Sequence, residues 1–204
     1  MDERKFQKSF INQITGRKKV KKKSIGVYKY LVHHSFFDVL INAYPIFFTL
    51  INEKSLTKEF DKSIFKFMQT SAFSPYMWEM PNEYRKFIKK SKFFKNIKYL
   101  DDLLHFEYTE LYLFMQQYKI KKSIKFSMTR KYKISKSIVL HKYKCNVLLS
   151  NFEQKEEVCI LGYYDFKLQE VTYRPINDLL FQFLKFINKE ISLKFNLRLF
   201  LKQN

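Results

Sequence analysis

The feature that most constrains this chain is an apolar stretch at residues 27–51 that carries a Tyr44-Pro45 pair in its second half. Before that pair, apolar side chains recur at steps of three and four residues, namely Tyr28, Leu31, Val32, Phe36, Val39, Leu40 and Ala43. This spacing predicts a long amphipathic helix. Proline disfavours helical angles in the residue before it, so we expect the helix to end at Tyr44. The helix and the apolar run that follows, residues 46–51, predict the centre of a hydrophobic core.

The same periodicity predicts further helices in the first half of the chain, at residues 5–14, at 55–69, from 81 onward and at 99–118. Gly16 is placed to end the first of them, Ser55 to cap the second and Pro81 to open the third. Asp101 and Asp102 fall in the first turn of the last helix, where negative charge favours the helix dipole.

Past Lys122 the pattern changes to alternation, which predicts strands at residues 124–128, within 137–149, at 158–166 and at 171–173. Pro175 and Asn177 then open a helix. Alternation in residues 191–201 favours a strand, with a helix left as the alternative. We therefore expect an α+β protein. An all-helical N-terminal domain, residues 1–120, is followed by a small mixed α/β domain, residues 121–204, with a mainly antiparallel sheet.

Composition indicates a folded, basic chain. Hydrophobic residues make up 46% of the 204 residues, which is too many for a disordered protein despite a net charge of +20. That charge predicts an acidic partner, although we attribute part of the lysine excess to a biased genome composition. One basic run stands out, formed by Arg17, Lys18, Lys19, Lys21, Lys22 and Lys23. A solvated linker is the favoured interpretation of this run, and a phosphate-binding arm is the alternative.

The sequence offers little chemistry. It has no glycine-rich phosphate loop and no nucleophile elbow. His33 and His34 are adjacent, so their side chains point in different directions on a helix. Cys145 and Cys159 lie in predicted strands, where a free cysteine is usually a small core residue. We expect no catalytic residue, metal or cofactor in this chain. The absence of a signal peptide and of a membrane-spanning run favours a cytoplasmic protein with no membrane partner.

Several blocks, in order, resemble the HvfC-like partner proteins of multinuclear iron-dependent oxidative enzymes, whose N-terminal part carries a DNA-binding-domain label. The blocks are Phe6 with Phe10, VYKYLVHHSFFDVLINAYPIFFTLI, residues 60–67, the Ser74-Pro75 loop, residues 84–88, YLDDLLHFEYTEL, KYKISKSIVLHKYKCNVL and residues 160–187. The chain departs from the family pattern at Lys29, where arginine is usual, at Leu103, where a small residue is common, and in lacking a glycine before Tyr84.

The resemblance implies a non-catalytic accessory subunit. Its partner would be a TIM-barrel enzyme that carries the iron and oxidises cysteines of a ribosomally made precursor peptide. This chain would bind the enzyme and help to present the leader of the peptide, which an exposed strand edge can accept as an added strand. The residues that match the family pattern, and so are candidates for partner binding, are Tyr28, Tyr44, Pro45, Asp102 and Glu107. A packing role is the alternative for each of them.

Two other functions stay open from the sequence. The first is DNA binding, possibly regulatory in purpose, through the strongly basic surface. The second is peripheral membrane binding, which is disfavoured because the apolar stripes have the spacing of core faces. Most aromatic residues also fall on such faces, and arginines, which commonly read bases, are scarce.

Overall fold

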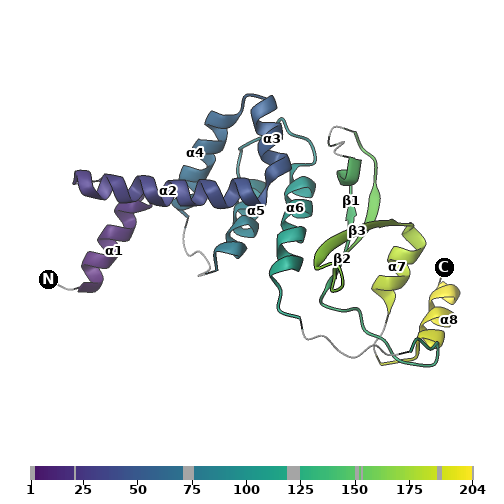
Figure 1. Cartoon of the computed structure of the whole chain (residues 1–204). Helices are drawn as coiled ribbons and strands as arrows, with labels where there is room; N and C mark the ends of the chain where they lie inside the picture. The colour runs from purple at the N-terminus through teal and green to yellow at the C-terminus, as the bar shows by residue number, and fades with distance from the viewer. Residues whose placement is uncertain are drawn as a thin grey trace. The chain divides into compact units, whose positions relative to one another are not determined.

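The computed structural model describes residues 3–20, 22–70, 76–118, 125–149, 152, 154–187 and 190–203. The chain divides into two compact units, Met1–Tyr108 and Thr109–Asn204. The division falls inside helix α6 (Leu100–Met115) and not after it, at residue 120, where the sequence places it. The first unit is helical and the second combines a small antiparallel sheet with helices, so the expected α+β class is confirmed (Figure 1).

The first unit contains α1 (Glu3–Ile14), α2 (Lys23–Ala43), α3 (Pro45–Glu53), α4 (Thr57–Met68), a short 3-10 helix, η1 (Met77–Glu79), α5 (Met80–Lys90) and the first part of α6. The predicted helices are present, and Pro81 lies in the first turn of α5 as expected. The core is rich in aromatic and long aliphatic side chains, including Leu40, Tyr44, Phe47, Ile51, Phe60, Ile64, Phe67, Met68, Tyr84 and Leu103.

The expected cap at Ser55 is wrong. Helix α4 has Leu56 at its N-cap, and no side chain caps it. Ser55 instead belongs to the end of α3, with a left-handed φ of 56°. The backbone N–H of Ser55 donates to Asn52, and that of Leu56 donates to Ile51 at 2.8 Å. These two bonds form a Schellman motif, so the tight turn between the two helices fixes Ser55 in a conformation that cannot cap α4.

The second unit contains three strands, β1 (Ile138–Tyr143), β2 (Val158–Asp165) and β3 (Glu170–Ile176), in the antiparallel order β1-β2-β3. The last part of α6, a second 3-10 helix, η2 (Val147–Leu149), and the helices α7 (Asp178–Phe186) and α8 (Leu193–Gln203) complete the described part of this unit. Gly162 in β2 pairs with Tyr173 in β3, and the Tyr173 ring lies so close that a Cβ on Gly162 would stand 3.0 Å from it.

Two strand predictions in this unit are wrong. Residue 124 lies outside the described residues, and 125–128 form no strand. Residues 193–203 form helix α8, against the favoured strand. The backbone N–H of Asn196 donates to the Ser192 carbonyl at 2.9 Å, which starts the helix. The Phe200 ring, four residues after Asn196, then packs against Phe183 and Phe186 of α7. The Ser192 hydroxyl caps the helix by accepting from the Phe195 N–H at 3.3 Å. This cap and the burial of Asn196 and Phe200, four residues apart, outweigh the alternation.

Among the described residues, no single helix is long and apolar enough to cross a bilayer. Helices α2 and α3 reach the required length and apolar composition only together, and they are bent by 102° relative to each other.

Candidate partner-binding site

Three of the five expected partner-binding residues meet where α2 turns into α3. Tyr44 lies between the two helices as the C-cap of α2 and the N-cap of α3, with φ −133° and ψ 57°, and Pro45 occupies the first turn of α3. Proline has no N–H to leave unsatisfied at this position, so the first free donors of α3 belong to Ile46 and Phe47. The Glu107 carboxylate accepts from both, at 2.6 Å and 3.2 Å.

This arrangement places a buried negative charge on a helix N-terminus. Glu107 is only 5% exposed, and its two hydrogen bonds satisfy backbone groups that α3 cannot bond internally. The positive end of the helix dipole favours the charge in the same place. The arrangement can therefore hold the α2–α3 corner in one geometry, and it does not present the carboxylate to solvent.

Tyr44 is buried beside this corner, at 1% exposure, and its hydroxyl donates to the Pro81 carbonyl at 2.6 Å. Burial raises the pKa of the Tyr44 phenol well above its ordinary value, against the opposing effect of the Arg85 guanidinium. A neutral phenol that donates to a backbone carbonyl links α2 to the start of α5. Of the three residues at the corner, Pro45 alone is exposed.

Tyr28 lies apart from the corner, in the N-terminal half of α2. It is 54% exposed, and its ring meets Phe10 of α1 edge-to-face at 5.7 Å. Tyr28 and Pro45 are therefore the two expected residues whose side chains are open to a partner. Tyr44 and Glu107 can act on a partner only through the position of the corner.

Asp102 is half-buried in the first turn of α6, and its neighbour Asp101 makes the ion pairs that the structure shows there. The Asp101 carboxylate contacts Arg85 at 2.9 Å and Lys89 at 2.6 Å. Burial opposes ionisation of Asp101, but the hydrogen bond from Lys89 and the charge of Arg85 outweigh it and lower the pKa of this carboxyl. The sequence placed both aspartates at the helix start, and it carried no signal that one of them pairs with α5.

The basic run is divided between two roles. The Arg17 guanidinium donates to the backbone carbonyls of Gln69, at 3.0 Å, and Thr70. These carbonyls follow the end of α4, where a cation interacts favourably with the helix dipole. Lys18, Lys19, Lys22 and Lys23 are exposed, and Lys21 lies outside the described residues. Arg17 thus ties the segment after α1 to the end of α4, whereas the four lysines are accessible and keep the phosphate-binding prediction open.

The two adjacent histidines face different sides, as expected. His33 contacts Asp61 of α4 at 3.2 Å, whereas His34 lies 3.9 Å from Asp38 of its own helix. Within the described ranges, no three His, Cys, Asp or Glu side chains lie close enough together to hold a metal ion.

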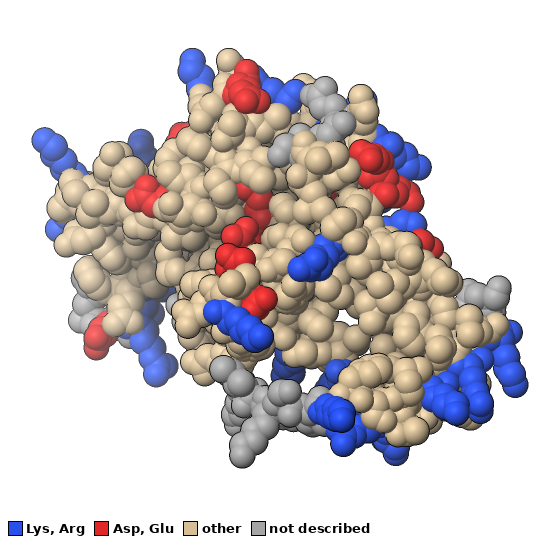
Figure 2. Space-filling model, turned by 45° about the vertical axis from the view of Figure 1, so that its right-hand side comes forward, with Lys and Arg blue, Asp and Glu red and all other residues tan. Residues whose placement is uncertain are grey.

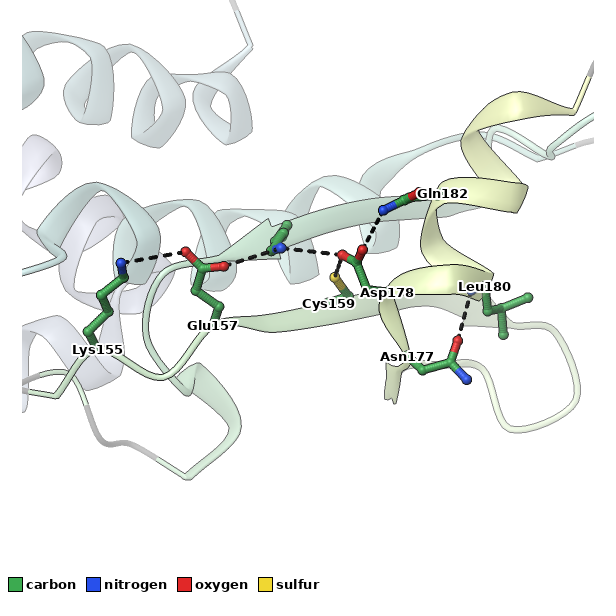
Figure 3. Close-up of polar contacts among 8 residues, drawn as sticks. Lys155, Glu157, Cys159, Asn177, Asp178, Leu180 and Gln182 are labelled. Atoms are coloured by element: carbon green, nitrogen blue, oxygen red, sulfur yellow. Dashed lines mark hydrogen bonds and ion pairs between the residues drawn. The ribbon is translucent and has the colours of Figure 1, made fainter. Parts of the chain in front are cut away.

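A polar network in the second unit surrounds Cys159 (Figure 3). Lys142 of β1 contacts Glu157 at 3.2 Å and Asp178 of α7 at 3.3 Å. The Cys159 thiol donates to Asp178 at 3.6 Å, and Gln182 donates to the other oxygen of the same carboxylate. The network ties the first turn of α7 to β1 and β2, and sequence reasoning missed it because its members come from three elements.

The network holds Cys159 in the protonated form. Burial raises the pKa of the Cys159 thiol, and the hydrogen bond to Asp178 raises it further. The Lys142 ammonium, which hydrogen-bonds to Asp178, lowers the pKa of that carboxyl and keeps it as an acceptor. Because the thiolate is the nucleophilic form of cysteine, this geometry suppresses nucleophilic chemistry at Cys159. Cys145 is also buried and forms no disulfide, in keeping with the expected core role of both cysteines. It lies two residues past the end of β1 and not in a strand, so that part of the prediction holds for Cys159 alone.

Comparison with known proteins adds no identity to this geometry. No family model matches the sequence, and no curated protein matches it either.

Proposed function

We propose that this chain is a non-catalytic accessory protein that acts in the cytoplasm. It binds a TIM-barrel, multinuclear iron-dependent oxidative enzyme and presents the leader of a ribosomally made precursor peptide, whose cysteines the enzyme modifies. The iron belongs to the partner enzyme.

One observation supports the proposal best. Two of the sequence blocks that carry the resemblance, the stretch with Tyr44-Pro45 and YLDDLLHFEYTEL, meet in space through the bonds from Ile46 and Phe47 to Glu107. The Tyr-Pro pair and a glutamate distant from it in sequence therefore form one capped helix corner. That relationship gives a physical reason for the two blocks to occur together in a chain of this family.

The sheet offers a place for the leader. The Tyr164 N–H donates to the Ser137 carbonyl, so Ser137 is a residue whose backbone groups face β2. In an antiparallel pair, successive residues direct their backbone groups alternately toward and away from the neighbouring strand. The backbone groups of Leu140 and Lys142 therefore face away from β2, at the outer edge of β1. No further described strand pairs with β1 or β3. Pro175, on β3, has no N–H to offer, so we assign the leader to the β1 edge.

The experiment is co-expression of a tagged chain with the genes beside its own, followed by pull-down and iron analysis. We expect an iron-loaded enzyme to co-purify through a wash at physiological salt. The matched control is the tagged variant Lys18→Glu, Lys19→Glu, which changes exposed charges of the first unit and should retain the enzyme. Recovery of the tagged wild-type chain without enzyme overturns the proposal.

The alternative is DNA binding, and the four exposed lysines of the basic run favour it. Binding to phosphates releases counterions, so a true DNA-binding protein shows a steep salt dependence and still binds at physiological ionic strength. If all DNA binding is lost at modest salt, the binding reflects only nonspecific attraction between lysines and phosphates, and the DNA-binding alternative fails. Titration of a labelled duplex at several salt concentrations separates the two outcomes.

A further inference from the structure

Two segments of the second unit contain basic residues and no acidic ones. Residues 125–136 carry Lys125, Arg130, Lys131, Lys133 and Lys136. Residues 191–203, which include α8, carry Lys194, Arg198 and Lys202. All eight of these side chains are exposed, and none forms an ion pair with another described residue. Such uncompensated charge is open to an acidic partner.

The two segments lie against each other. The N–H of Leu193 donates to the Arg130 carbonyl at 2.9 Å, and the N–H of Lys194 donates to the Met128 carbonyl at 2.8 Å. Lys131 and Ser192 form an isolated antiparallel bridge beside these bonds. The two segments that carry the eight cations therefore adjoin, and we call the surface that they form the α8 face. Lys and Arg side chains gather in this region, at the lower right of Figure 2.

The α8 face also has an apolar depression. Phe195, Leu199 and Leu201 line it together with Arg198 and Lys202, and its volume is about 520 Å³. Phe195 is 49% exposed and Leu201 is 63% exposed. Apolar surface left open beside cations suits a ligand that brings carboxylates and an apolar side chain together.

The composition of the face favours a peptide over nucleic acid. Binding of single strands relies on aromatic rings that stack on bases and on a basic groove. Here the depression has two leucines and one phenylalanine, and the exposed Phe126 ring already stacks on Tyr132 at 5.8 Å. Six of the eight cations are lysines, and the Arg130 guanidinium donates to the Lys125 carbonyl.

We propose that the α8 face binds an acidic peptide segment that places an apolar side chain in the depression formed by Phe195, Leu199 and Leu201. The inference rests on the proposed function for the source of the segment, which is a part of the precursor leader outside the strand that adds to the β1 edge. Carboxylates of the segment pair with Arg198, Lys202 and the lysines of residues 125–136.

The test is a fluorescence-anisotropy titration of the full chain with a labelled synthetic peptide of Glu, Asp, Leu and Phe at physiological salt. Its counterpart has Gln and Asn in place of the acids. The variant Arg198→Glu, Lys202→Glu reverses two exposed charges, and we expect its Kd to rise about tenfold. Leu201→Ser should weaken binding about threefold by removing apolar contact. The control Lys18→Glu, Lys19→Glu makes the same charge change in the first unit and should leave the Kd within about twofold.

Equal weakening in both charge-reversal variants would overturn the inference, because the attraction would then be general. Displacement of the peptide by a single-stranded oligothymidylate that binds more tightly would overturn it as well and assign the face to nucleic acid. The pull-down of the iron enzyme is read separately. If the wild-type chain retains the enzyme but the Arg198→Glu, Lys202→Glu variant binds the peptide normally, this inference alone fails. If the Arg198→Glu, Lys202→Glu variant loses peptide binding but the wild-type chain retains no enzyme, the proposed function alone fails.

Discussion

The Glu107 carboxylate lies 2.6 Å from the backbone nitrogen of Ile46, which is 61 residues earlier in the chain. A side chain of α6 thereby supplies the N-terminal cap that α3 lacks, since no side chain near Tyr44 caps it. Because Pro45 removes one donor and Glu107 accepts from the next two, the bend between α2 and α3 leaves no free N–H at these three positions.

Replacing Glu107 by Gln should destabilise the first unit. The amide keeps one acceptor but turns an N–H₂ group toward the backbone donors, so we expect a loss of about 1–3 kcal/mol in the free energy of unfolding. The single tryptophan, Trp78, lies in the first unit and reports its unfolding by fluorescence in urea. The exposed Glu53→Gln, at the end of α3 in the same unit, is the matched control and should change stability by less than about 0.5 kcal/mol. Equal effects of the two substitutions would contradict the capping role.

Local features of the sequence were sufficient for much of the fold. Pro45 ends α2 through its effect on the preceding residue, and Asn177 caps α7 by accepting from the Leu180 N–H at 2.8 Å. Both signals act within a few residues. The buried face of α4 was likewise predictable, because helical spacing alone selects it. The predicted face of α2 is buried only at its C-terminal end, at Leu40 and Ala43, whereas Tyr28 and Leu31 are more than half exposed.

What the sequence missed depends on contacts between distant segments. Arg17 was placed in a basic run, yet its partners are carbonyls at Gln69 and Thr70. Alternation favoured a strand at residues 191–201, whereas Phe200 packs on α7 and makes this segment a helix. Glu107 matched a pattern without revealing its role as a cap. The sequence therefore predicted the break between α2 and α3, but it did not predict that Glu107 of α6 caps α3 at this break.

Burial of the Tyr44 phenol predicts a loss of stability at high pH. Its folded-state pKa lies well above the ordinary value, so between about pH 10 and that folded pKa the unfolded state binds fewer protons. Stability is then complete below about pH 10 and falls by about 1.4 kcal/mol per pH unit above it for each such group. Tyr44→Phe should be less stable at pH 8, because it loses the bond to Pro81, but should show a shallower decline.

The check on this prediction is urea unfolding followed from pH 8 upward. The exposed Tyr30→Phe serves as the control and should keep the slope of the wild type. An unchanged slope in Tyr44→Phe would show that other groups cause the alkaline loss.

Two glycines of the first unit should respond to alanine in opposite directions. Gly16 has a φ of 77°, and a Cβ there would stand 2.8 Å from the Phe65 ring, so Gly16→Ala meets both strain and a clash. We expect a loss of about 1–2 kcal/mol from the backbone alone. Gly26 lies in α2 with nothing within 4 Å of an added Cβ, and Gly26→Ala should gain about 0.5–1 kcal/mol. Thermal unfolding of both variants measures the difference, and a loss of stability in Gly26→Ala would contradict it.

The network around Cys159 predicts that its thiol reacts slowly with alkylating reagents, and that Asp178 causes part of this slowness. The Asp178 carboxylate accepts the thiol hydrogen bond and raises the pKa of Cys159, so Asp178→Asn should lower that pKa. If the shift is about one unit, the thiolate fraction at pH 8 rises about tenfold, while lower intrinsic nucleophilicity reduces the gain in labelling rate to about threefold. Iodoacetamide labelling followed by mass spectrometry separates Cys159 from the buried Cys145, which is the internal control. Equal acceleration at both cysteines would indicate that the substitution opens the second unit, and no acceleration would show that burial alone protects the thiol.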